Sequence, residues 1–204
     1  ATQVEIETGQ PEDVELLIDN KLLEKVPERA QVTGFAVESS LSIGEAKKLA
    51  ADGPLPEVAV GIVEELRLVK ESAEIAALEA AGELADSVWQ EFLDEGGIRE
   101  GRTEIEAAAD LEYRLRKAGA EALSFDTILA SGVNATKPHA GVSRDPIVPG
   151  LVTVDFGIYL DGYASDQTRT VCVGEPDELS ATLYDVVLRS QRAGAAAVAP
   201  GTAL

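Results

Sequence analysis

Apolar residues recur at helical spacing through the first half of the chain. In the longest such stretch, from Glu71 to Glu95, they fall at every third or fourth position, and two glycines follow. This pattern predicts a long amphipathic helix whose apolar face packs on a core. Shorter patterns nearer the N-terminus predict helices over 11–26 and 42–49, a strand over 32–37, and a strand or the lead into the next helix over 58–63.

A capping signal marks the start of the next predicted helix. Thr103 is followed three residues later by Glu106, which is the capping-box pattern, and Gly119 follows Lys117 at the other end. Beyond residue 120 the apolar period changes from 3.6 to 2, which is typical of half-buried strands. The elements predicted there are strands over 127–130, 151–155, 157–160 and 168–173 and a helix over 178–198. We therefore predict an α+β region from residue 67 onward, after a small mixed region.

The Asp-Gly pair at 161–162, between alternating apolar and aromatic residues, predicts a β-hairpin with a two-residue turn. This register places Asp155 opposite Thr168, and it places Asp155 and Asp166 on one face as diagonal neighbours. Gly157 would leave space beside them. Two converging carboxylates repel each other unless a cation lies between them, and carboxylate oxygens suit divalent metals. An exposed hairpin whose aspartates contact only water remains an open alternative.

His139 is the only histidine in the chain, and it lies in the turn-rich segment 131–140 between two predicted strands. Imidazole can donate or accept a proton near neutral pH, so His139 is a candidate catalytic residue. A single histidine in a loop is equally compatible with no catalytic role. The pattern alone does not place it near the aspartates.

The chain is strongly acidic, with 17 Lys and Arg against 37 Asp and Glu and a net charge of −20. This charge argues against nucleic acid as a partner, because phosphate contacts need clustered basic residues, and against anionic membrane surfaces. We find no pattern of a signal peptide or a membrane span, and the single Cys172 excludes an internal disulfide. A cytoplasmic protein from a halophilic host is therefore expected.

Residues 66–201 resemble the first half of the pita-bread metallopeptidase domain of the creatinase, aminopeptidase P and prolidase family. The resemblance rests on pieces at 67–71, 74–75, 101–104, 124–126, 130–132, 138–139, 154–157 and 165–170. Residues 1–66 resemble the end of the small creatinase-type α/β domain that precedes it. The resemblance implies an α+β pita-bread fold, with a truncated catalytic domain at 67–204.

The same resemblance implies roles for three residues. Asp155 matches the first metal-binding aspartate, Asp166 matches the aspartate that bridges two divalent metal ions (manganese, cobalt or zinc), and His139 matches the histidine that contacts the scissile amide. The implied reaction is hydrolysis of an N-terminal Xaa-Pro bond in a peptide with proline at the second position, with the metals as Lewis acids. The implied assembly is a homodimer.

The family completes its metal site with a histidine and two glutamates further downstream, and this chain has no second histidine. We therefore expect the 204 residues to be a fragment of a longer enzyme, cut at both ends and inactive by itself. Two alternatives keep the fold. One is a hydrolase of a small non-peptide C–N bond, such as an ectoine hydrolase or a creatinase, and the other is a non-catalytic binding module. The presence of both aspartates weighs against the metal-free creatinases and against the binding module.

Overall fold

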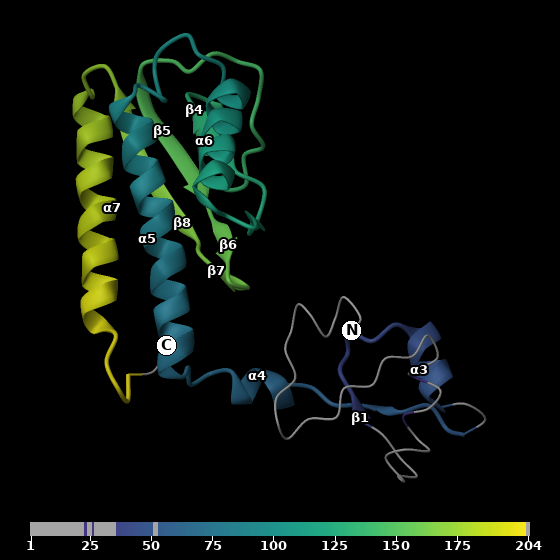
Figure 1. Cartoon of the computed structure of the whole chain (residues 1–204). Coiled ribbons are helices and arrows are strands. Elements are labelled where there is room, and N and C mark those ends of the chain that lie inside the picture. The colour runs from purple at the N-terminus through teal and green to yellow at the C-terminus, as the bar shows by residue number, and fades with distance from the viewer. Residues whose placement is uncertain (1–22, 24–25, 27–35, 51–52, 203–204) are drawn as a thin grey trace. The chain divides into compact units, whose positions relative to one another are not determined.

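The computed structural model describes residues 23, 26, 36–50 and 53–202. The chain divides into two compact units, Ala1–Val69 and Lys70–Leu204, and each is considered by itself (Figure 1). That the first unit is the end of a creatinase-type domain stays a prediction. Within the described part, no helix combines the length and the hydropathy needed to cross a bilayer.

The first unit contains two short strands and two helices among its described residues: β1 (Ala36–Val37), α3 (Ile43–Ala50), β2 (Glu57–Val58) and α4 (Ile62–Leu66). The strands β1 and β2 pair in parallel. Helix α3 matches the predicted helix over 42–49, and it begins with reciprocal hydrogen bonds in which the Ser42 hydroxyl accepts from the Glu45 N–H and the Glu45 carboxylate accepts from the Ser42 N–H, both at 3.2 Å.

Two predictions for this unit have a different outcome. The strand predicted over 58–63 is wrong beyond Val58, because residues 62–66 form helix α4 instead. The helix predicted over 11–26 lies outside the described residues apart from positions 23 and 26, which are helical. Of the strand predicted over 32–37, only residues 36–37 are described, and they are extended.

The second unit is an α+β assembly, as predicted. Its elements are α5 (Ser72–Asp94), α6 (Glu104–Ala118), β3 (Ala122–Leu123), β4 (Ile128–Ser131), the 3-10 turn η1 (Asn134–Thr136), β5 (Gly150–Phe156), β6 (Ile158–Leu160), β7 (Tyr163–Ala164), β8 (Gln167–Val173) and α7 (Glu178–Ala197). Among the described strands, one antiparallel sheet has the order β4-β5-β8 and another has the order β3-β6-β7.

The predicted hairpin register is confirmed. Leu160 pairs with Tyr163 beside the turn, and Asp155 pairs with Thr168 further along the same ladder. At the turn, Asp161 and Gly162 both have positive φ, 49° and 77°, which is the backbone conformation that a two-residue hairpin of this hand requires. One register therefore continues from the turn through both sheets.

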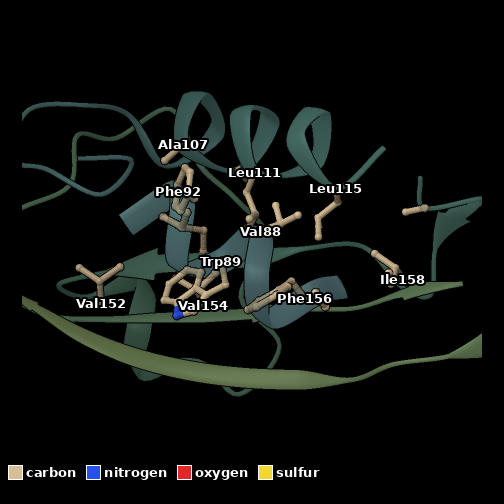
Figure 2. Packing of buried hydrophobic residues seen from close by; sticks show 14 of the residues in the cluster. Val88, Trp89, Phe92, Ala107, Leu111, Leu115, Val152, Val154, Phe156 and Ile158 are labelled. Carbon is tan, nitrogen blue, oxygen red and sulfur yellow. The ribbon is translucent and has the colours of Figure 1, made fainter. Parts of the chain in front are cut away.

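The core of this unit lies between the helices and strand β5. Along β5 the side chains alternate, so that Val152, Val154 and Phe156 are buried while Thr153 and Asp155 are only half-buried. Figure 2 shows these buried strand residues facing side chains of α5 and α6. The other members of the cluster are Ala85, Val88, Trp89, Phe92, Ala107, Ala108, Leu111, Leu115, Ala120, Leu129, Ile147 and Ile158. Asp155 therefore projects from the opposite side of β5.

Helix α5 matches its predicted extent, but only part of its apolar face is buried. The Glu71 N–H donates to the Glu74 carboxylate at 2.8 Å at the start of the helix. Trp89 and Phe92 are buried in the core, and Trp89 stacks on Phe156 with ring centroids 5.3 Å apart. By contrast Ile75, near the N-terminal end, is exposed. The N-terminal turns of α5 thus extend past the core.

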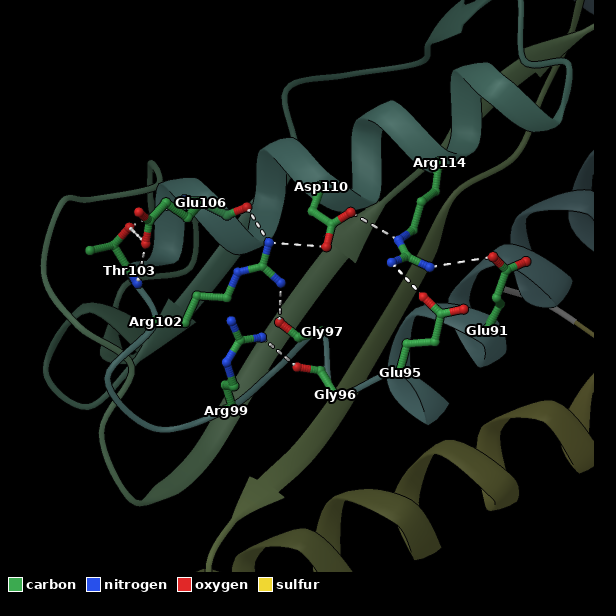
Figure 3. Close-up of polar contacts among 10 residues, drawn as sticks. All are labelled: Glu91, Glu95, Gly96, Gly97, Arg99, Arg102, Thr103, Glu106, Asp110 and Arg114. Atoms are coloured by element: carbon green, nitrogen blue, oxygen red, sulfur yellow. Dashed lines mark hydrogen bonds and ion pairs between the residues drawn. The ribbon is translucent and has the colours of Figure 1, made fainter.

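An ion-pair network joins α5 to α6 across the surface (Figure 3). Arg114 contacts Asp110 at 2.9 Å and reaches Glu91 and Glu95 on α5 at 3.3 and 2.8 Å. Arg102 donates to the other oxygen of Asp110 at 3.0 Å. Burial opposes the ionisation of Asp110, but the hydrogen bonds from the two arginines outweigh it and hold the pKa of that carboxyl below its usual value.

Candidate active site

The three residues singled out in the sequence line one cavity of about 780 Å³. His139 comes from the loop between β4 and β5, Asp155 from β5, and Asp166 from the residue before β8. The cavity is completed by Glu112, Leu123, Phe125, Asp126, Thr127, Ile128, Ala140, Gly141 and Val142. The fold therefore brings together the two aspartates and the histidine, which sequence spacing could not place near them.

Asp155 is fixed by its strand partner. Its alternation with the buried side chains of β5 directs it away from the helices, and the hydroxyl of Thr168, opposite it in the ladder, donates to its Oδ1 at 2.6 Å. One carboxylate oxygen is thereby held in place. The other oxygen accepts no hydrogen bond from the described residues.

Asp166 is exposed, and its backbone is anchored on both sides. Before it, the buried Ser165 donates its N–H to the Ile158 carbonyl at 2.8 Å and accepts the Ile158 N–H on its hydroxyl at 3.1 Å. After it, the Gln167 amide donates to the Gly82 carbonyl on α5 at 3.0 Å. No described residue donates a hydrogen bond to the Asp166 carboxylate, which leaves it available for a ligand.

Gly157 does not leave open space beside the aspartates, contrary to the sequence expectation. A Cβ at this position would lie closer than 3 Å to the Ser165 carbonyl oxygen and the Ser124 hydroxyl. These two groups are hydrogen-bonded to each other, with Ser124 Oγ donating at 2.9 Å. The missing side chain thus lets the segment after β3 approach the hairpin, and the next residues in that segment, Phe125 and Asp126, line the cavity.

The cavity is strongly acidic. Four carboxylates line it, from Glu112, Asp126, Asp155 and Asp166, and none of its described lining residues is Lys or Arg. Oxygen ligands without a neighbouring basic side chain favour a divalent cation, since the cation relieves the repulsion between them. Glu112 and Asp126 were missed in the sequence, where they carry no signal that separates them from the other acidic residues.

Two observations bear on whether these residues fit a metal ion. The Thr127 hydroxyl is buried at the cavity wall and has no hydrogen-bond partner in the described part of the chain, which marks a polar site where a partner is missing. Yet no three metal-ligating side chains among the described residues lie close enough together to hold an ion. Asp155 and Asp166 therefore fit as part of a ligand set and do not complete one.

The fold and this acidic cavity together define the class: the second unit is part of a pita-bread metallopeptidase domain. The pattern of metallopeptidase family M24 matches residues 76–204, and the chain belongs to this family. Members of the family generally use divalent metals.

Named relatives and solved structures agree with this assignment. The chain is 35% identical over 173 residues to a Xaa-Pro dipeptidase of Pyrococcus horikoshii, a match that covers 83% of this chain and 49% of the relative. The Xaa-Pro dipeptidase structure from Bacillus anthracis aligns with a TM-score of 0.77 at 36% identity, covering 84% of this chain and 48% of the other. The X-Pro aminopeptidase structure from Thermotoga maritima aligns with a TM-score of 0.76 at 31% identity, covering 88% and 51%. The chain spans about half the length of these relatives.

Proposed function

We propose that the protein containing this chain hydrolyses the peptide bond between an N-terminal residue and a following proline. The observation that carries the proposal is the convergence of His139, Asp155 and Asp166 on one acidic cavity within an M24 domain. Relatives named as Xaa-Pro dipeptidases and an X-Pro aminopeptidase support this substrate class.

Asp155 and Asp166 would hold the divalent ions, with manganese, cobalt and zinc as the candidates. When bound, such ions supply Lewis-acid polarisation of the scissile carbonyl and activate water for attack. The Thr168 hydroxyl supports this role, because it holds one oxygen of Asp155 and so orients the other toward the ion.

The remaining cavity residues would bind and orient the peptide. Glu112 and Asp126 add negative charge to the cavity wall, and negative charge attracts the N-terminal ammonium group of a peptide. His139 is exposed, so its imidazole can donate a hydrogen bond to the carbonyl oxygen of the scissile bond. Such a bond strengthens as negative charge develops on that oxygen in the transition state.

The expected histidine and two glutamate ligands would come from parts of the protein outside these 204 residues. The 204 residues alone should therefore bind metal weakly and hydrolyse nothing, since two carboxylates leave most coordination positions open to water. Calorimetric titration of the isolated chain with manganese or cobalt tests this proposal. Tight binding at a stoichiometric ratio would contradict it.

The substrate proposal is tested by offering the full-length protein Ala-Pro and, separately, ectoine. We expect release of proline and no ectoine turnover, and the opposite result would establish a hydrolase of a small C–N bond. Asp155→Asn, Asp166→Asn and His139→Ala should each abolish or strongly reduce proline release. Asp161→Asn is the matched control, because it removes the same charge from the same hairpin at the exposed turn. Metal binding and peptide binding without any turnover would indicate a binding module.

We further propose that the protein is a cytoplasmic homodimer adapted to high salt. The charge of −20 supports the salt adaptation, because salt screens the repulsion that such a surface creates. Light scattering should give twice the monomer mass, and the melting temperature should rise with KCl concentration. A monomer, or a melting temperature that falls as KCl is added, would refute the respective part.

A further inference from the structure

Glu104, the first residue of α6, is a buried charged residue that the proposed chemistry does not use. It is 1% exposed. Buried carboxylates are expensive unless hydrogen bonds or opposite charges compensate the lost hydration. No Lys or Arg of the described chain forms an ion pair with it, so hydrogen bonds must supply the compensation.

Those hydrogen bonds all come from one segment. Glu104 Oε1 accepts the N–H of Ser131 at 2.8 Å. Its Oε2 accepts the side-chain amide of Asn134 at 2.7 Å and the N–H of Ser143 at 3.0 Å. The same Asn134 amide also donates to the Gly141 carbonyl at 3.0 Å. A single carboxylate therefore ties together the two ends of segment 131–143, and Asn134 braces its middle.

This segment carries His139. Its neighbour Ala140 is 1% exposed, so the chain is pinned beside the histidine while the imidazole itself remains exposed at the cavity. Backbone bonds add to the attachment, since the Ile105 N–H donates to the Ser143 carbonyl at 3.0 Å. With the segment fastened at both ends to the start of α6, the position of His139 depends on Glu104.

We infer that Glu104 is a positioning residue that acts through segment 131–143 and holds His139 over the cavity that contains Asp155 and Asp166. The catalytic part of this inference rests on the proposed function. The effect on the segment itself does not. Glu104 makes no contact with the cavity: its carboxylate is fully used in holding the loop.

Glu104→Gln is the informative variant, because it keeps the side-chain shape and places an NH₂ group where N–H donors now point. If its amide oxygen replaces Oε1, the NH₂ group faces the donors of Asn134 and Ser143. We expect hydrogen exchange of the amides in 131–143 to become at least about 10-fold faster, since their acceptor is lost. We expect kcat to fall about 10- to 100-fold, as for other residues that orient a catalytic group, with KM changed less than about threefold.

The experiment measures hydrogen exchange by mass spectrometry and steady-state kinetics on Ala-Pro, both with the full-length protein. Glu106→Gln is the matched control: it makes the same change on the same helix, Glu106 is exposed, and glutamine also serves at this capping-box position. Asn134→Ala is a milder second variant that leaves Ser131 and Ser143 bonded to Glu104. It should shift both readouts in the same direction by less.

The decisive comparison places Glu104→Gln in a His139→Ala background. If Glu104 acts through His139, it should lower kcat little further there, whereas a general structural defect would lower kcat equally in both backgrounds. Unchanged exchange of 131–143 in both Glu104→Gln and Asn134→Ala would overturn the inference, and so would faster exchange spread over all of α6. A wild-type protein that cleaves no Xaa-Pro substrate would refute the proposed function, while the exchange result would still decide whether Glu104 holds the segment.

Discussion

Gly157→Ala tests how the hairpin and the segment after β3 fit together. An alanine Cβ would meet the backbone oxygen of Ser165 and the hydroxyl of Ser124, and backbone cannot rotate away as a flexible side chain can. Forcing an extra methyl group into a packed site costs about 1–3 kcal/mol. Separating the Ser124–Ser165 hydrogen bond adds about 1 kcal/mol. We therefore expect a loss of about 2–4 kcal/mol in the free energy of unfolding.

The assay is urea denaturation followed by circular dichroism, with the midpoint compared at constant slope. Gly82→Ala is the control, because Gly82 lies within α5 and its added Cβ would meet only the Gln167 amide at 3.8 Å, an ordinary contact. Alanine is the better helix former, so this control should gain about 0.5–1 kcal/mol. If Gly157→Ala unfolded within about 0.5 kcal/mol of the wild type, the close approach at this glycine would not constrain the fold.

Two further predictions concern the polar network and the proposed metal site. The pKa of Asp110 is lowered in the folded protein, so its stabilisation is present above the unfolded-state pKa and is lost as the pH falls through the folded-state pKa. Asp110→Asn should therefore cost about 1–2 kcal/mol at pH 7 in thermal or urea unfolding and progressively less in strong acid; a cost that did not depend on pH would contradict this explanation. Thr168→Val keeps the side-chain shape but removes the donor to Asp155, so manganese affinity of the full-length protein should fall about 10- to 100-fold in a metal titration. Unchanged affinity would show that the hydroxyl does not orient the carboxylate.

Elements whose signals are local could be predicted from the sequence. The capping box of Thr103 and Glu106 and the turn at 161–162 each fix a backbone geometry within a few residues, and both have the predicted form. The turn also fixed the longer register, which is why Asp155 was correctly placed opposite Thr168. By contrast the apolar run at 58–63 has no such local signal, and its second half forms helix α4.

The parts of the site that depend on distant contacts could not be predicted in this way. His139 reaches the cavity because its loop is fastened to α6, more than thirty residues away in the chain. Glu104 gave no warning, since in the sequence it is one acidic residue in the first turn of a helix, where solvent-exposed acids are common. Gly157 was read as open space, whereas the structure fills that space with a segment from before β4.

The hairpin works as a ruler for the proposed metal site. Asp155 and Asp166 lie on strands joined by a turn of only two residues, and every pairing between them is counted from that turn. Inserting or removing a single residue there would move one strand by one position, which sends its side chains to the opposite face. Asp166 would then leave the cavity although no cavity residue had been changed. The length of the loop at 161–162, far from any proposed ligand, should thus be as constrained as the ligands themselves.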